Sequence, residues 1–318
     1  MPARIESPAN QLPSPALRRF AWGVLVYFIL VILWGTLVRA TGSGAGCGNH
    51  WPLCNGTVMQ PSASVNTLIE FTHRITSGLS LIAVMVLLVW TIVGTVRGHL
   101  ARWAASAALI LTLMEAILGA LLVRLGLTAQ SQSPLRPAFL ALHLANTLLL
   151  LAALTLTAHL LGRRRGFLCS TIHLRAPFAV LAGLLAMLVV GVTGSLAALG
   201  DTLFPAASLG AAMQQDLSNA SVWLLRWRWA HPGIALLAAL FVIWLLPRAV
   251  RGPAREGHRP LALLVLGLVT AACGLGALDV LLLAPVWMQV AHLAAADSLW
   301  AALVVLAARL TLEPIEGN

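Results

Sequence analysis

Eight stretches of about 20 apolar residues dominate this sequence of 318 residues. A helix needs roughly 20 apolar residues to cross the ~30 Å hydrocarbon core of a bilayer, whereas barrel strands alternate in units of about 10. Because 59% of the residues are hydrophobic and only 9% are charged, the chain has more apolar surface than a soluble core can bury. The runs predict an all-α integral membrane protein with transmembrane helices at about 19–40, 69–95, 104–124, 138–161, 176–198, 228–247, 260–282 and 287–308.

Arginine supplies all of the basic side chains other than histidine, since the chain has no lysine. If the N-terminus is cytoplasmic, fourteen arginines fall on the inner side of the predicted helices and five on the outer side. The positive-inside rule therefore predicts that both termini are cytoplasmic. The basic balance is explained by this topology and gives no reason to expect a nucleic-acid partner.

The two halves of the chain resemble each other. Three segments recur in the same order: TGSGAGCGNHWPLC from Thr41 and TGSLAALGDTLFPA from Thr193, each after an apolar run; GALLV from Gly119 and GALDV from Gly276; HLANT from His143 and HLAAA from His292. This order predicts a duplicated unit of four helices. Four is an even number, so both copies have the same orientation and form a parallel repeat.

The repeat predicts two pseudo-symmetric four-helix bundles. We expect the N-terminal bundle at 19–161 and the C-terminal bundle at 176–309. A basic cytoplasmic linker at 162–175 would join them, and cytoplasmic tails would lie at 1–18 and 310–318.

Of the nine histidines, four lie in predicted loops, one (His159) lies near the inner end of the predicted helix at 138–161, and the remaining four lie deeper in predicted transmembrane helices. They lie on the second and fourth helix of each half, one to two turns from the outer surface: His73, His143, His231 and His292. Ionisable side chains inside a bilayer are costly and usually functional. Two imidazoles on facing helices of a bundle are the arrangement that ligates haem iron axially. We therefore predict one haem site from His73 and His143, and a second from His231 and His292.

Other metal sites match the residues less well. A di-iron bundle site needs Glu-x-x-His on two helices, and that spacing occurs once, at Glu70 and His73. In the loop after the first helix, Cys47, His50 and Cys54 offer three zinc ligands without an evident fourth. This loop is predicted to face the oxidising side, where the two cysteines are expected to form a disulfide. Structural and redox roles for that bridge both stay open.

Glu70 precedes His73 by three residues and shares its helix face. Beside a haem ligand, a carboxyl group can transfer protons or stabilise positive charge on a reacting carbon. The alternatives are a boundary glutamate wetted by the outer loop, or one paired with Arg74. No acid stands at the matching place before His231, which predicts chemistry in the N-terminal half and electron transfer or structure in the C-terminal half. Three arginines at outer helix ends are candidates for haem propionate contacts or for membrane anchors: Arg39, Arg226 and Arg228.

Three segments carry a resemblance to a known family. TGSGAGCGNHWPLCNG, IEFTHRITSG and GALDVLLLAPVWMQVAHLAAA resemble haem A synthase of the CtaA/Cox15 family, and the resemblance extends from the first helix to the last. It implies that the ring D methyl group of haem O is oxidised to the formyl group of haem A for cytochrome oxidase assembly. It implies that His73 and His143 ligate the substrate haem, that Glu70 is the catalytic acid, and that His231 and His292 ligate a haem b cofactor.

The same resemblance implies an oxidoreductase in the cell (inner) membrane, with its haem sites toward the outer face. Its partners would be the haem O substrate, a haem O synthase, an electron donor or acceptor, and membrane lipid. Some members have a second cysteine pair in the C-terminal half, and residues 199–224 contain none, which puts any two-disulfide scheme in doubt here.

The residues alone leave two other functions open. One is a diheme cytochrome b-like electron-transfer protein, although histidines at a single depth count against a relay across the membrane. The other is a transporter with parallel repeats, although few polar residues lie near the middle of the predicted helices.

Overall fold

The computed structural model describes residues 13–58, 63–129, 131–163, 172–174, 178–218, 222–250 and 257–314. Within these residues, eight helices are long and apolar enough to cross a membrane. They are α1 (Pro15–Ala40), α2 (Val65–Gly94), α3 (Leu100–Arg124), α4 (Leu135–Leu161), α5 (Phe178–Leu203), α7 (Arg226–Ala249), α8 (Arg259–Leu281) and α9 (Val286–Thr311). Shorter elements are η2 (Ser43–Ala45), β1 (Ile172–Leu174), α6 (Leu209–Leu217), η3 (Trp223–Leu225) and β2 (Leu312–Pro314). The predicted all-α membrane fold is confirmed.

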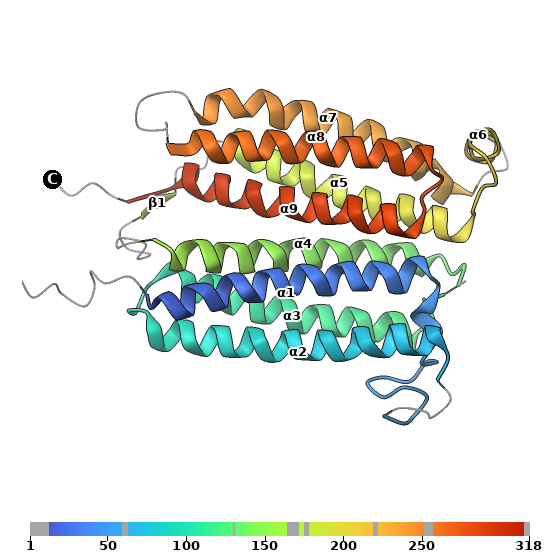
Figure 1. Ribbon diagram of the computed structural model, residues 1–318, viewed down its shortest axis with the longest axis horizontal. Coiled ribbons are helices and arrows are strands. Elements are labelled where there is room, and N and C mark those ends of the chain that lie inside the picture. Colours follow the sequence, from blue (N-terminus) through green and yellow to red (C-terminus); the bar gives the residue numbers. More distant parts are fainter. Residues whose placement is uncertain are drawn as a thin grey trace, which may run out of the picture.

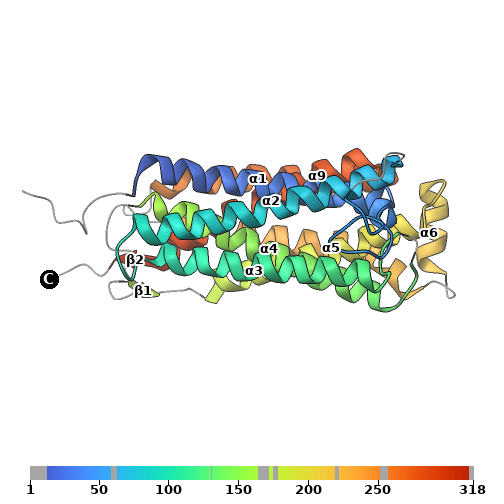
Figure 2. The same cartoon turned by 90° about the horizontal axis from the view of Figure 1, so that it is seen from below.

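The eight long helices form two groups that lie side by side. Figure 1 shows α1 to α4 in one group and α5, α7, α8 and α9 in the other, and Figure 2 shows that all of them run along one direction. The first group has an apolar core that includes Leu87 and Leu151, and the second has a core that includes Val265 and Leu303. Each half therefore buries its own apolar side chains, as a duplicated bundle requires.

The two groups contact each other mainly through α1 and α4 of the first and α5 and α9 of the second. Trp300 of α9 reaches across this interface, where its indole Nε1 donates a 2.7 Å hydrogen bond to the carbonyl of Leu148 on α4. Such a bond satisfies a polar group that neither lipid nor an apolar core can satisfy.

Serine caps determine where α1 and α2 begin. Ser14 Oγ accepts a 3.2 Å hydrogen bond from Leu17 N–H, and Pro15 occupies the first helical position. Ser64 Oγ accepts a 3.2 Å bond from Thr67 N–H. These caps satisfy N–H groups that have no partner inside a helix. They explain why both helices begin before their apolar runs.

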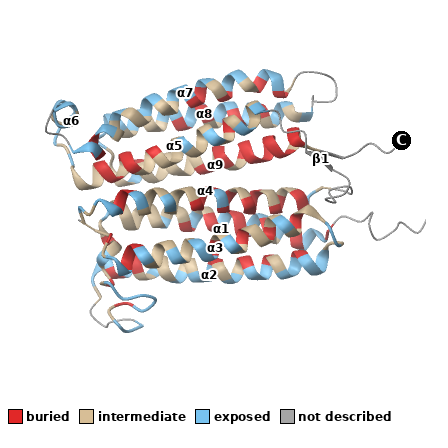
Figure 3. Ribbon diagram, turned by 180° about the vertical axis from the view of Figure 1, so that it is seen from behind, coloured by how far each residue is buried: buried red, intermediate tan, exposed pale blue. Residues whose placement is uncertain are grey.

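Large apolar side chains remain exposed along the outward faces of the helices. Val93 is 80% exposed and Leu237 is 69% exposed. Figure 3 shows buried residues concentrated where helices face one another and exposed residues spread along the outer faces. Soluble proteins rarely expose contiguous apolar surface of this extent. The exposure matches a bundle surrounded by lipid, and the prediction of a multi-pass membrane protein is confirmed.

The segment Thr193 to Ser195 lies inside α5, which continues to Leu203. The helix predicted at 176–198 therefore ends later, at Leu203, and Thr193 to Ser195 does not follow it as Thr41 to Ser43 follows α1. The physical reason lies in the hydroxyl groups. Thr193 Oγ1 donates to the carbonyl of Val190 at 3.0 Å, and Ser195 Oγ donates to that of Val192 at 2.8 Å. These bonds allow both side chains to sit within an apolar helix.

Two short features were not expected from the sequence. Helix α6 follows α5, and Ser208 caps it by accepting from Ala211 N–H at 3.2 Å. Strands β1 and β2 pair antiparallel, with Ile172 opposite Pro314, so the chain between the two halves meets the end of α9. Most of the predicted linker and much of both tails lie outside the described residues, as do six arginines of the topology prediction: Arg4, Arg164, Arg165, Arg175, Arg251 and Arg255. The orientation stays a prediction.

Candidate functional site

The four membrane histidines lie toward the same end of the two bundles. His73 and His143 are each the ninth residue of α2 and α4, while His231 and His292 are the sixth of α7 and the seventh of α9. All four helices begin at the end of the molecule that has the 41–58 loop, called the loop end here (Figure 1). His73 is close enough to His143 to interact with it electrostatically, and His231 with His292. The structure thus places together the same pairs that the sequence suggests.

A glycine on the neighbouring helix faces each histidine ring. A Cβ atom added to the glycine would lie within 3.9 Å of the imidazole Cε1 in every case, at these distances: Gly35 to His73 3.0 Å, Gly119 to His143 3.9 Å, Gly194 to His231 3.0 Å and Gly276 to His292 2.9 Å. Contacts near 3 Å are tighter than a real side chain tolerates without movement. Glycine therefore leaves room for the ring at Gly35, Gly194 and Gly276, whereas a Cβ atom at Gly119 would make ordinary van der Waals contact with His143.

These glycines give the register of the repeat. Gly35 of α1 corresponds to Gly194 of α5, because both contact the first histidine of their half. The match between the two TGS segments, which aligns Gly42 with Gly194, is therefore wrong by seven residues. Gly, Thr and Ser are common in such helices, so a three-residue match places the register poorly. The matches beginning at Gly119 and Gly276 agree with the structural register.

The ring nitrogens fit axial ligation of haem iron. Nδ1 of His73, His143 and His292 is buried without a hydrogen-bond partner among the described residues, and Nδ1 of His231 lies 3.2 Å from Thr193 Oγ1. In the part of the chain that the structure describes, no group of three or more His, Cys, Asp and Glu is placed to hold a bare metal ion. Haem iron needs only axial protein ligands, because the macrocycle supplies the others. The two pairs therefore fit haem.

Glu70 of α2 connects its helix to the loop. The residue is only 3% exposed. Its Oε2 accepts a 2.8 Å hydrogen bond from the N–H of Cys47, and its Oε1 lies 2.5 Å from Arg74 Nη2. Arg74 Nη1 in turn donates to loop carbonyls, that of His50 at 2.7 Å among them. The ion pair with Arg74 considered from the sequence is present, and both carboxylate oxygens are held by charge-assisted hydrogen bonds.

Cys47 and Cys54 form a disulfide, as predicted. Both are buried, with exposed fractions of 0% and 2%. A Cβ atom at Gly46 would lie 2.6 Å from the backbone of Asn66, so glycine lets the loop approach α2. Thr67 Oγ1 completes this contact by donating to the Gly46 carbonyl at 2.9 Å. The disulfide is therefore held against the first turns of α2, the helix that contains Glu70.

Two of the three candidate propionate arginines have protein partners. Arg39 of α1 reaches the second bundle, donating to Thr202 Oγ1 at 2.8 Å and to Gln289 Oε1 at 2.7 Å. Arg228 Nε lies 2.9 Å from an oxygen of Asp201. Arg226 is exposed at the start of α7. A contact between any of them and a propionate stays a prediction.

Glu115 of α3 is a site residue that the sequence patterns did not identify. Its Oε1 lies 3.5 Å from Nδ1 of His143. The signal in the sequence is a pair of polar residues, Asn146 and Thr147, three and four positions after His143.

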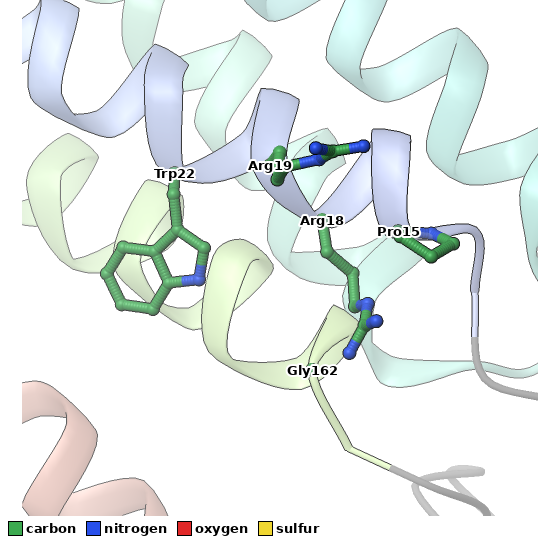
Figure 4. Close-up of a pocket in the computed structure, with 5 residues that line it drawn as sticks. All are labelled: Pro15, Arg18, Arg19, Trp22 and Gly162. Atoms are coloured by element: carbon green, nitrogen blue, oxygen red, sulfur yellow. The ribbon is translucent and has the colours of Figure 1, made fainter.

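A pocket at the opposite end of the molecule has no part in this site. Figure 4 shows that it is lined by α1 residues near the helix start and by Gly162 just after α4; the α1 residues are Pro15, Arg18, Arg19 and Trp22. The histidine pairs lie near the loop end, whereas this pocket lies where α1 begins and α4 ends. The pocket is therefore separate from the proposed haem sites.

Comparison with known proteins agrees with the site. Residues 18–304 match the COX15-CtaA family, described as cytochrome oxidase assembly protein. A Thermus thermophilus protein named Protoheme IX farnesyltransferase is 42% identical over 304 residues, 93% of this chain and 49% of that protein. The Heme A synthase of Geobacillus kaustophilus is 28% identical over 286 residues, 87% of this chain and 86% of that protein.

The chain therefore spans about half the length of the Thermus relative and most of the Geobacillus one. The Heme A synthase of Alkalihalophilus pseudofirmus is 39% identical over a shorter region of 128 residues, 40% of each chain. The family match runs from the start of α1 into α9 and includes all four histidines, Glu70 and both loop cysteines. The chain belongs to the COX15-CtaA family of cytochrome oxidase assembly proteins.

Proposed function

We propose that this chain is a haem A synthase, an oxidoreductase that converts the ring D methyl group of haem O to the formyl group of haem A. The observation that carries the proposal is the difference between the surroundings of the two histidine pairs. Both halves have two facing histidines, and only the N-terminal half has a buried acid three residues before a ligand. The Heme A synthase relatives and the family match support the same conclusion.

His73 and His143 would hold haem O as substrate, and His231 and His292 would hold haem b as cofactor. Bound haem b supplies one-electron redox chemistry. The chain places each site on two long helices, which suits a site that must hold a large planar group in one orientation. Haem O has a farnesyl tail, and the exposed apolar faces of the N-terminal bundle would contact membrane lipid, in which that tail can remain.

Glu70 would act beside the reacting carbon. Oxidation of a methyl group removes protons and electrons from that carbon, and a fixed carboxylate accepts a proton or stabilises developing positive charge. Its hydrogen bonds with Cys47 and Arg74 hold the side chain in place before substrate binds. Preorganisation of this kind avoids a reorganisation cost during the reaction.

The proposal includes the surroundings of the enzyme. Both termini would be cytoplasmic in the cell (inner) membrane, with the haem sites in the outer half. A haem O synthase would supply the substrate. The formyl oxygen would come either from water, with an electron acceptor taking the electrons removed from the methyl carbon, or from dioxygen, with an electron donor reducing its second oxygen atom to water. The similarity to a Thermus protein named Protoheme IX farnesyltransferase supports the link to haem O.

Expression together with a haem O synthase tests the function. Haems extracted from the purified protein and separated by chromatography should include haem A, with haem B retained from the C-terminal half. The variant Glu70→Ala should keep haem O bound and stop its conversion, a loss of at least about 100-fold if Glu70 transfers the proton. Normal haem A formation by this variant would remove Glu70 from the mechanism. Haem B alone in the wild type would instead favour a diheme electron-transfer protein.

A further inference from the structure

A polar network connects α3 and α4 next to His143. Asn146 Nδ2 donates both to a carboxyl oxygen of Glu115 and to the carbonyl of Leu111, the latter at 2.9 Å. Thr147 Oγ1 contacts the other Glu115 oxygen. Asn146 and Thr147 are 7% and 5% exposed. The Glu115 carboxyl group is therefore held at both oxygens, within a membrane helix where an unpartnered polar group would be costly.

This network fixes the carboxyl group beside the imidazole. His143, Asn146 and Thr147 share one face of α4, because they are three and four residues apart. On α3, Glu115 lies one turn before Gly119, the glycine that faces the His143 ring. Glu115 Oε1 is 3.5 Å from Nδ1 of His143, longer than a hydrogen bond, and Nδ1 has no hydrogen-bond partner among the described residues. A small rotation of the ring would bring the two atoms into bonding distance.

The C-terminal half lacks every part of this network. Gly276 corresponds to Gly119, so Ala272 occupies the position of Glu115. After His292, Ala295 and Ala296 occupy the positions of Asn146 and Thr147. None of these three alanines has a polar side chain. The ring of His292 lies instead beside the backbone carbonyl of Ala272. The His292 ring also lies nearer to its glycine: a Cβ atom added at Gly276 would lie 2.9 Å from Cε1 of His292, whereas one added at Gly119 would lie 3.9 Å from Cε1 of His143.

We propose that Glu115 is a positioning residue for His143, accepting a hydrogen bond from Nδ1–H and so fixing the tautomer and the orientation in which Nε2 faces the substrate haem. An iron-ligating histidine commonly donates its other ring N–H to such an acceptor, and a carboxylate makes the ligand more basic than a carbonyl does. The two haem sites would then differ in ligand strength as well as in the presence of Glu70. This inference rests on the proposed function in taking His143 as a haem ligand.

Haem content and the electron paramagnetic resonance spectrum of the ferric protein test this role without measuring activity. The protein is purified from cells that also express a haem O synthase, and the extracted haems are quantified. Glu115→Leu should weaken farnesylated haem binding by about 10- to 100-fold, the usual effect of removing such a partner. It should also shift the low-spin signal of the N-terminal haem. Glu115→Gln keeps an acceptor oxygen, so its haem content and signal should lie between those of the wild type and the leucine variant.

Two matched variants separate positioning from folding. Thr193→Val removes the hydroxyl beside His231 and should shift only the haem B signal. Asp297→Asn alters an acid of α9 that is 1% exposed and whose carboxyl oxygens have no hydrogen-bond partner among the described residues, and it should leave both signals unchanged. A Glu115→Leu protein with wild-type haem content and signal would overturn the proposal. An equal loss of both haems would also overturn it, since that result indicates a general structural role.

Failure of the proposed function gives a different result. If the wild-type protein holds haem B in both halves, haem A synthesis is excluded, and the signal of the N-terminal haem is read in a His292→Ala background. A shift of that signal in Glu115→Leu would still support positioning by Glu115. No shift would overturn it.

Discussion

In the N-terminal half Glu70 stands three residues before the first histidine, and in the C-terminal half Arg228 stands there. Both side chains hold the chain at the loop end. Glu70 binds the N–H of Cys47 and pairs with Arg74, while Arg228 pairs with Asp216 of α6 at 3.2 Å. The residue at this position therefore anchors the loop end in both halves, with a negative charge in the N-terminal half and a positive charge in the C-terminal half. Only the acid adds a group that can accept a proton beside a bound haem.

The comparison separates scaffold from chemistry. Both halves have a histidine pair, each ring near a glycine of a neighbouring helix. The polar groups that differ, Glu70 and Glu115, both lie in the half proposed to hold the substrate. If both pairs bind haem as proposed, the two halves share the binding geometry and differ in the acids available for catalysis. The predictions below test this division.

Removal of one axial histidine should have the largest effect. His143→Ala leaves a six-coordinate haem without one protein ligand, so farnesylated haem should be lost while haem B stays near the wild-type amount. His292→Ala should do the reverse. Chromatography of the extracted haems measures both. Loss of both haem types from either single variant would show that the two halves do not bind independently and would break the comparison.

Alanine at the glycines should have a smaller effect in the same direction. A Cβ atom at Gly35 or Gly194 meets a histidine Cε1 at 3.0 Å, and overpacking of this kind costs about 1–3 kcal/mol. Gly35→Ala should weaken haem binding in the N-terminal half only, and Gly194→Ala in the C-terminal half only. Gly23→Ala is the control. Gly23 lies in α1, as Gly35 does, but a Cβ atom added there would meet nothing within 4 Å beyond the backbone of its own helix among the described residues. Equal haem loss from the control would contradict the packing argument.

Most of the fold could be predicted from the sequence, because membrane helices are determined by length and apolarity. The ends were less accurate, since caps such as Ser14 and Ser64 extend helices beyond their apolar runs. The histidine pairs were visible because ionisable residues are rare in these helices. Glu115 was not recognised, because its role depends on how α3 faces α4. That rotation is set by side-chain packing between the helices, which a single helix sequence does not specify.

The loop bridge should matter least. Joining Cys47 and Cys54 closes a short loop, worth about 2.5 kcal/mol in the chain-entropy model. A Cys47→Ala, Cys54→Ala protein should unfold at a lower temperature, because the stabilisation from closing the loop is lost. It should still fold, because the C-terminal half closes its own loop end through Arg228 without a disulfide. Its haem A yield per folded molecule should stay at the wild-type level, since Glu70 is bound by the backbone N–H of Cys47, which alanine retains. A fall in yield with both haem sites filled would instead give the bridge a redox role, and the two loop ends would then differ in function as well as in construction.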